Sequence, residues 1–202
     1  MKNLPNLPNQ ITISRLILSG VFFTLLGLLD QKHGRALYTA QPVPANCTLL
    51  LDLSVAVFVL TAATDFLDGY LARRWGMIST FGRIADPFVD KVFICGSFIF
   101  LIPISPLVQP WYVVVVIMRE FLVSGLRSFL EGKGVAFGAG LGGKLKMICQ
   151  SVTVPSVLLY RAHLVDFAPA RWTVIVLLGA SLVFTISSSV EYVRRAVGHL
   201  HR

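Results

Sequence analysis

Four aspartates are spaced in a pattern that could hold divalent metal ions. Asp65 and Asp68 stand three residues apart in one segment, and Asp86 and Asp90 stand four apart in the next. Residues three or four apart share one face of a helix, so each pair presents two carboxylates to one side. One or two Mg²⁺ or Mn²⁺ ions held by such carboxylates can bind a diphosphate. The pattern therefore predicts a metal-assisted site for a phosphorylated substrate.

A purely structural role for these aspartates is the alternative. Carboxylates at helix ends pair with basic neighbours, which here are Arg73, Arg74, Arg83 and Lys91. Four carboxylates so close together would repel one another without added cations, and charges at membrane depth are costly. The set of four therefore favours a ligand-binding role over simple pairing.

Small residues accompany the aspartates. Gly69 and Ala72 flank Asp68, and Gly76 and Gly82 follow in the turn. Small side chains allow a helix or a ligand to approach the backbone closely. Alone they would indicate helix packing, whereas next to the aspartates they favour a nucleotide pocket.

Apolar helices must position this site. The chain has 202 residues, 55% hydrophobic and 14% charged, a charged fraction far below that of a soluble domain. Its length suits about six spans of ~20 residues. We expect one all-α integral membrane domain over residues 1–202, with an interfacial segment at 1–10. The six spans are expected near residues 11–29, 49–70, 83–104, 111–130, 144–160 and 172–193, with an outer loop at 30–47.

Positive charge predicts the orientation. With the N-terminus inside, 14 Lys and Arg residues fall on the inner side, and the outer four are Lys32, Arg35, Arg161 and Arg171. The positive-inside rule then places both termini and the aspartates on the cytoplasmic side of the inner membrane. It also accounts for the net charge of +8, so no nucleic-acid partner is expected. The residues expected in the interfacial belts are Trp111, Trp172 and Tyr192.

The whole run from Asp65 to Asp90 fits one spacing, D-x2-D-G-x2-A-R-x8-G-x3-D-x3-D. On these residues the chain resembles the CDP-alcohol phosphatidyltransferases, six-helix membrane enzymes that transfer a phosphatidyl group from CDP-diacylglycerol to an alcohol. The resemblance implies a homodimer that uses two Mg²⁺ or Mn²⁺ ions. It implies metal binding by Asp65, Asp68, Asp86 and Asp90, with Asp90 also acting as the general base. The residues implied around the CDP moiety are Asp65, Gly69, Ala72, Arg73 and Gly82.

Further motifs resemble the phosphatidylglycerophosphate synthase branch. They are Arg119-Glu120-Phe121, Gly125-Leu126-Arg127, Gly143-Lys144-Leu145-Lys146 with Gln150, and Asn3-Leu4-Pro5-Asn6 with Asn9, Thr12 and Arg15. This branch implies sn-glycerol 3-phosphate as acceptor, giving phosphatidylglycerophosphate and CMP. Cations must bind its phosphate, and those implied are Arg119, Arg127, Lys144 and Lys146. Met147 departs from the branch, which often has threonine there.

The cations also have a simpler interpretation. Three could be positive-inside anchors only, namely Arg127, Lys144 and Lys146. Arg119 differs because it follows the apolar run 113–118 and lies within the span. A buried arginine needs a partner, and either Glu120 or a ligand phosphate would serve.

Other functions are alternatives. The same chemistry could use inositol phosphate, serine or phosphatidylglycerol, although the basic residues favour a phosphorylated alcohol over serine. A cation- or proton-coupled transporter would carry carboxylates near the bilayer midplane, whereas these lie at one end. A non-catalytic lipid-binding protein is the remaining alternative.

Overall fold

Six helices make up the fold of this protein, as seen in a computed structural model that describes residues 7–39, 45–75, 80–133 and 140–200. Side chains are described for residues 13–31, 45–64, 88–133 and 140–198. The helices are α1 (Leu7–Thr39), α2 (Ala45–Trp75), α3 (Thr80–Leu101), α4 (Pro110–Gly132), α5 (Leu141–His163) and α6 (Ala168–Leu200). The prediction of an all-α chain with six helical segments is therefore confirmed, and the described ranges contain no strand.

The first helix is longer than expected. The sequence predicted an outer loop over residues 30–47, but α1 continues to Thr39, so that boundary was wrong. The apolar stretch ends near residue 29, whereas a helix ends where its backbone can no longer continue. Proline disfavours the helical conformation of the preceding residue, and Pro42 and Pro44 follow α1 closely.

Three helices are long and apolar enough to cross a membrane. Within the described residues these segments are Ile13–Gln31, Ala45–Thr64 and Ala168–Gly198. The other three helices, α3 to α5, are 22 or 23 residues long and carry charged residues among their apolar ones. Large apolar side chains also face outward, including Leu16, Met118, Phe121 and Trp172. An outward apolar surface of this kind is suited to lipid.

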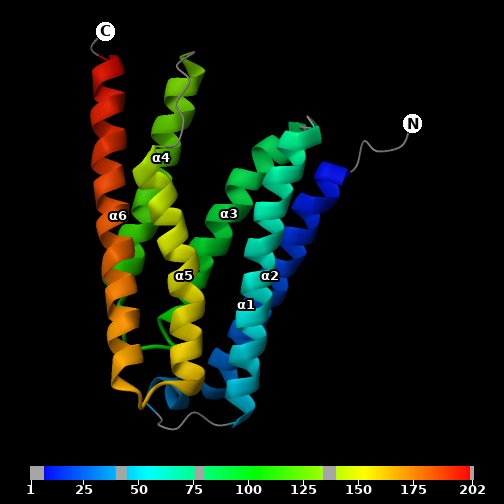
Figure 1. Ribbon diagram of the computed structural model, residues 1–202, viewed down its shortest axis with the longest axis vertical. Helices are drawn as coiled ribbons and strands as arrows, with labels where there is room; N and C mark the ends of the chain where they lie inside the picture. Colours follow the sequence, from blue (N-terminus) through cyan, green and yellow to red (C-terminus); the bar gives the residue numbers. More distant parts are fainter. Residues whose placement is uncertain (1–6, 40–44, 76–79, 134–139, 201–202) are drawn as a thin grey trace.

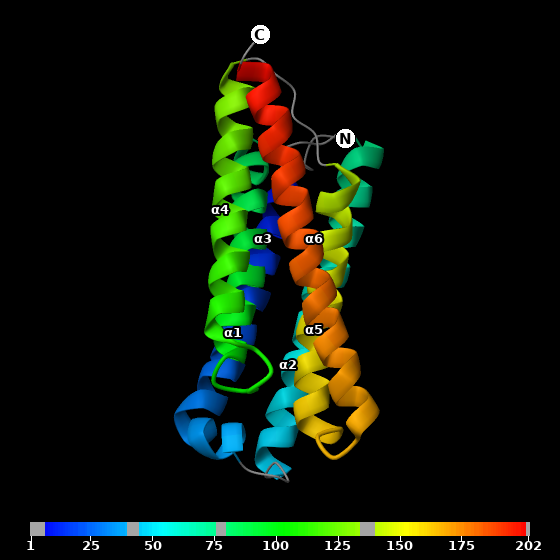
Figure 2. The ribbon, with the colours of Figure 1, turned by 90° about the vertical axis from the view of Figure 1, so that its left-hand side faces the viewer.

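The helices run alternately up and down the bundle. Figure 1 shows α4, α5 and α6 on one side, α1 and α2 on the other, and α3 between them. Contacts of α5 with α2 and α3, and of α4 with α3, join the two sides. Figure 2 shows the same bundle from the side. Six alternating helices bring the start of α1 and the end of α6 to one end, together with the end of α2 and the start of α3 (Figure 1). We call this the site end.

An aromatic cluster fixes the first three helices against one another. The ring of Phe22 on α1 lies 5.6 Å from that of Phe58 on α2 and 5.4 Å from that of Phe93 on α3. Aromatic pairs at these separations add favourable interaction to their apolar burial. Gly96 permits the approach of α1 to α3, because a Cβ there would lie 2.6 Å from the ring of Phe23. The core thus sets how α3 is placed beside α1.

Candidate functional site

The helix boundaries place the four aspartates as the sequence predicted. Asp65 and Asp68 belong to the last part of α2, and Asp86 and Asp90 to the first part of α3. Because α2 ends at Trp75 and α3 begins at Thr80, the two pairs lie on consecutive helices joined by a short connection. Some predicted residues lie outside the described side chains, namely Asp65, Asp68, Gly69, Ala72, Arg73, Gly82 and Asp86. Their roles stay predictions.

Asp90 forms an ion pair that joins two helices. Its carboxylate on α3 accepts a hydrogen bond from the guanidinium of Arg15 on α1. The Arg15 side chain is 7% exposed and that of Asp90 is 44% exposed. The expected charge partners of the aspartates included Lys91, and Arg15 was assigned only to the opening motif. The sequence did contain a signal for this ion pair: Arg15 lies inside the apolar stretch of α1, and a buried arginine needs an anionic partner.

The chemistry of the aspartates suits hard divalent cations. Carboxylate oxygens are the ligands that Mg²⁺ and Mn²⁺ take in proteins. Asp90 is half exposed, so a carboxylate at this place remains open to a ligand. Among the residues whose side chains are described, no three His, Cys, Asp or Glu side chains gather closely enough to hold a metal.

A cluster of buried and partly buried charges lies between α4, α5 and α6. We call Arg119, Glu120, Arg127 and Lys146 the cation cluster. Glu120 Oε1 lies 3.3 Å from Nη1 of Arg119 and also forms an ion pair with Nζ of Lys146. Arg119, Glu120 and Lys146 are each less than a tenth exposed. Glu120 is thus one of the two partners considered for Arg119, and the same carboxylate also pairs with Lys146.

Two side chains of α6 complete this cluster. Arg119 Nη2 donates a hydrogen bond of 2.9 Å to Ser188 Oγ, and Arg127 Nη2 donates one of 3.0 Å to the hydroxyl of Tyr192. Both guanidinium carbons lie over the Tyr192 ring, 5.8 and 5.9 Å from its centre. A cation over an aromatic face at this distance is attracted by the electrons of the ring.

The predicted place of Tyr192 in an interfacial belt is wrong. Tyr192 is 3% exposed and faces α4, whereas Trp111 and Trp172 are more than half exposed. The sequence carried a signal for this, because Ser181, Thr185, Ser188 and Tyr192 recur at helical spacing in an apolar helix. Polar residues along one face of such a helix indicate a side turned toward other polar groups.

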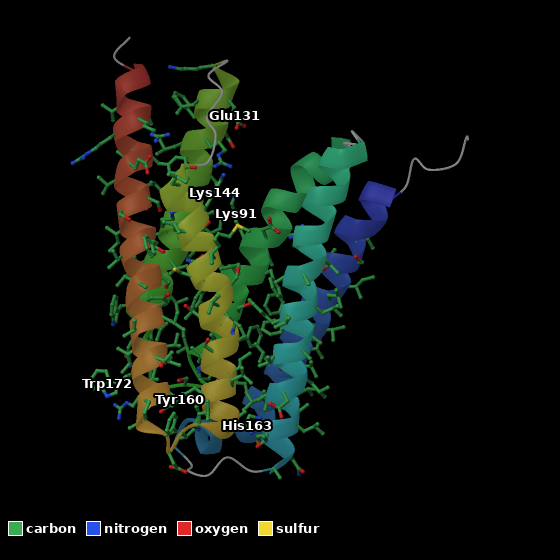
Figure 3. All side chains as sticks on the ribbon, viewed as in Figure 1. Lys91, Glu131, Lys144, Tyr160, His163 and Trp172 are labelled. Carbon is green, nitrogen blue, oxygen red and sulfur yellow. The ribbon has the colours of Figure 1, made fainter. Side chains whose placement is uncertain are left out.

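Lys144 stands apart from the cation cluster. It lies in the first turn of α5 and is exposed, while Lys146, two residues later, is buried. Residues two apart do not face the same side of a helix. Figure 3 shows Lys91, Glu131 and Lys144 toward the site end, and Tyr160, His163 and Trp172 toward the opposite end. The structure brings together three of the four predicted acceptor-binding cations.

Charge and donor capacity indicate what the cluster can bind. Three cations and one carboxylate leave a net charge of +2. A phosphate monoester carries about −1.5 to −2 at neutral pH. The Nε–H groups of Arg119 and Arg127 are buried and have no acceptor among the described residues. The cluster therefore combines a charge complementary to a phosphate with two buried Nε–H donors that have no acceptor among the described residues.

The chain is similar to known proteins over most of its length. The sequence model of the CDP-alcohol phosphatidyltransferase family matches residues 5–187. The CDP-diacylglycerol–glycerol-3-phosphate 3-phosphatidyltransferase of Bacillus subtilis is 34% identical over 190 residues, which cover 93% of each chain. The enzyme of the same name from Rickettsia typhi is 31% identical over 154 residues, which cover 76% of each chain.

Proposed function

Because the chain belongs to the CDP-alcohol phosphatidyltransferase family, we propose that it transfers a phosphatidyl group from CDP-diacylglycerol to sn-glycerol 3-phosphate. The products are phosphatidylglycerophosphate and CMP, so the enzyme acts in phospholipid biosynthesis. The observation that carries the choice of acceptor is the buried cation cluster, whose net charge of +2 matches a phosphate monoester dianion. Similar proteins named for glycerol 3-phosphate support the same acceptor.

Acceptors without a phosphate monoester fit the cluster less well. Serine offers no such group, and the head group of phosphatidylglycerol carries only a phosphodiester monoanion. The buried Arg119 and Lys146 and the partly buried Arg127, beside one carboxylate, would keep uncompensated charge with either of them. Inositol phosphate carries the same phosphate as glycerol phosphate, so the experiment below includes it.

The reaction needs a proton acceptor beside the attacking hydroxyl. We assign this role to Asp90, whose half-exposed carboxylate can take the proton while Arg15 orients it. The hydroxyl oxygen forms a bond to the lipid-bearing phosphorus of the diphosphate, and the bond from that phosphorus to CMP breaks. The cations of the cluster hold the phosphate of the acceptor throughout this step.

The proposed reaction uses divalent metal ions. The residues that would hold Mg²⁺ or Mn²⁺ are Asp65, Asp68, Asp86 and Asp90. When bound, these ions neutralise the diphosphate and stabilise CMP as it leaves. The small residues Gly69, Ala72 and Gly82, with Arg73, would line the space for the CDP moiety.

The proposed setting is a bacterial inner membrane. We infer six transmembrane helices, both termini and the active site on the cytoplasmic side, and a homodimer. The long apolar helices support a position in the bilayer, and the common end shared by the start of α1 and the end of α6 supports a common side (Figure 1).

A substrate panel tests the proposal. Purified protein is incubated with CDP-diacylglycerol, Mg²⁺ and one of glycerol 3-phosphate, inositol phosphate, serine or phosphatidylglycerol, and release of CMP is measured. We expect release of CMP only in the reaction that contains glycerol 3-phosphate as the acceptor. CMP with inositol phosphate instead would reassign the acceptor, and no CMP with any of them would favour the transporter or the lipid-binding protein.

A further inference from the structure

The match to the family ends at residue 187, immediately before the α6 residues that touch the cation cluster. Ser188 and Tyr192 follow at positions four residues apart, so they lie on one face of α6. That face meets α4, where Arg119 and Arg127 stand eight residues apart. Each of these two cations on α4 therefore donates a hydrogen bond to one hydroxyl on α6.

The hydroxyl of Ser188 has a fixed direction. Its Oγ donates a hydrogen bond of 3.2 Å to the carbonyl oxygen of Thr185 and accepts one from Arg119. Because the hydroxyl hydrogen is directed to the backbone, a lone pair stays available to the guanidinium. Ser188 is 1% exposed, so water does not replace this contact.

The ring of Tyr192 is held by apolar packing. It belongs to a small buried cluster with Val123 and Leu130 of α4 and Ala196 of α6. The hydroxyl at the end of a ring fixed in this way accepts the hydrogen bond of Arg127. The guanidinium groups of Arg119 and Arg127 both lie over this one ring. The ring therefore also influences the distance between these two like charges.

Close packing of α5 reinforces the arrangement. A Cβ at Gly142 would lie 3.3 Å from Cβ of Ser188, and one at Gly143 would lie 3.7 Å from the Tyr192 hydroxyl. The glycines thus bring the first turn of α5, which precedes Lys146, directly against the two α6 residues. One face of α6 contacts both helices that carry the cations.

We infer that Ser188 and Tyr192 are positioning residues for the acceptor, which hold the guanidinium groups of Arg119 and Arg127 in the orientation that binds the acceptor phosphate. This inference rests on the proposed function. The two residues carry no charge and act through the arginines. Losing either hydroxyl leaves the cations in place but lets their guanidinium groups rotate. The loss should therefore weaken binding of the acceptor phosphate and leave binding of CDP-diacylglycerol unchanged.

Kinetics of hydroxyl-deletion variants test the inference. The variants Tyr192→Phe and Ser188→Ala are compared with Tyr160→Phe and Ser187→Ala, which make the same changes at the opposite end of the bundle and on the exposed face of α6. We expect the KM for glycerol 3-phosphate to rise roughly tenfold in the first two, the scale of one hydrogen bond to a charged group. Their kcat and KM for CDP-diacylglycerol should stay near wild type, as should all constants of the two controls. The variant Ser188→Thr keeps a hydroxyl and should recover most of the affinity.

A double-mutant cycle shows whether Tyr192 acts through Arg127. In an Arg127→Ala background, Tyr192→Phe should cause no further rise in the KM for glycerol 3-phosphate, because the hydroxyl has lost the group that it orients. An equal effect in both backgrounds would overturn the inference. So would an unchanged KM for glycerol 3-phosphate in Tyr192→Phe and Ser188→Ala, or a parallel change in both substrate constants. Failure of the proposed function is a separate result, since wild-type protein would then release no CMP with glycerol 3-phosphate.

Discussion

The guanidinium of Arg15 on α1 forms an ion pair with the carboxylate of Asp90 on α3, 75 residues further along the chain. The arginine is nearly buried and the aspartate is half exposed. The pair therefore holds the proposed base from its buried side and leaves the other side open. This relationship makes α1 part of the site, although α1 carries none of the four aspartates.

Replacing Asp90 by Asn should abolish turnover and leave the fold intact. The amide has nearly the shape of the carboxylate but cannot take the proton of the acceptor hydroxyl, and general bases contribute about 10²- to 10⁴-fold. CMP release and the thermal midpoint in detergent measure the two effects. The matched control is Asp52→Asn, because Asp52 is similarly exposed, at 41%, and pairs with His163 on α5. Near-normal activity of Asp90→Asn would remove Asp90 from the role of base.

Replacing Arg15 by Ala should lower kcat and change the KM for CDP-diacylglycerol little. The carboxylate of Asp90 would then be free to turn away from the hydroxyl, and a misplacement of about 1 Å can cost about 10²-fold in rate. Arg15→Lys keeps the charge and should retain more activity than Arg15→Ala. Steady-state kinetics of the three proteins test this order. Equal kcat in all three would show that Arg15 does not orient the base.

Alanine variants of the two lysines of α5 should differ sharply in their kcat/KM for glycerol 3-phosphate. Lys146→Ala removes a buried cation of the cluster and should lower kcat/KM for glycerol 3-phosphate by about tenfold to a hundredfold. Lys144→Ala removes an exposed charge, which is screened by solvent and salt, and should cost much less. Kinetics with varied glycerol 3-phosphate compare the variants. A larger loss in Lys144→Ala would contradict the assignment of the cluster as the acceptor site.

Adding a methyl group at Gly96 should destabilise the bundle. A Cβ there would lie 2.6 Å from the ring of Phe23, which itself stacks on Phe100 at 5.6 Å. Overpacking of this kind costs about 1–3 kcal/mol. The control is Gly179→Ala, because a Cβ at Gly179 meets nothing within 4 Å. Thermal unfolding in detergent should show a lower midpoint for Gly96→Ala only, and equal midpoints would disprove the close approach of α1 to α3.

Chelation should stop the reaction without unfolding the protein. The four aspartates need cations to hold a diphosphate, whereas the apolar core of the bundle does not involve them. Treatment with EDTA should abolish CMP release, and added Mg²⁺ or Mn²⁺ should restore it. Helical circular dichroism followed in parallel should stay constant. Full activity after exhaustive chelation would exclude the metal-assisted mechanism.

The sequence predicted those features that depend on local pattern. Long apolar stretches gave the number of helices, and the spacing of the aspartates placed them where α2 ends and α3 begins. Arg119 within an apolar run indicated an arginine that needs an anionic partner, and Glu120, one of the two partners considered, pairs with it. Each of these features is set by the residues of one segment and its immediate neighbours.

Features that depend on the rotation of one helix against another were not predicted. Nothing adjacent to Arg15 indicates Asp90, and nothing adjacent to Tyr192 indicates Arg127, because each pair joins distant segments. An aromatic residue near a helix end suits either a membrane interface or a buried contact. The packing of α6 against α4 decides between them for Tyr192.

The division of the bundle has a consequence for how acceptor preference can change. The four aspartates lie on α2 and α3, and Arg15 on α1, while the cation cluster and its positioning residues lie on α4, α5 and α6. If the proposed roles hold, the residues for the lipid-nucleotide chemistry and those for the choice of alcohol belong to separate, contiguous halves of the chain. A chimaera that keeps the first three helices and exchanges the last three is therefore a direct route to a transferase with a new head group.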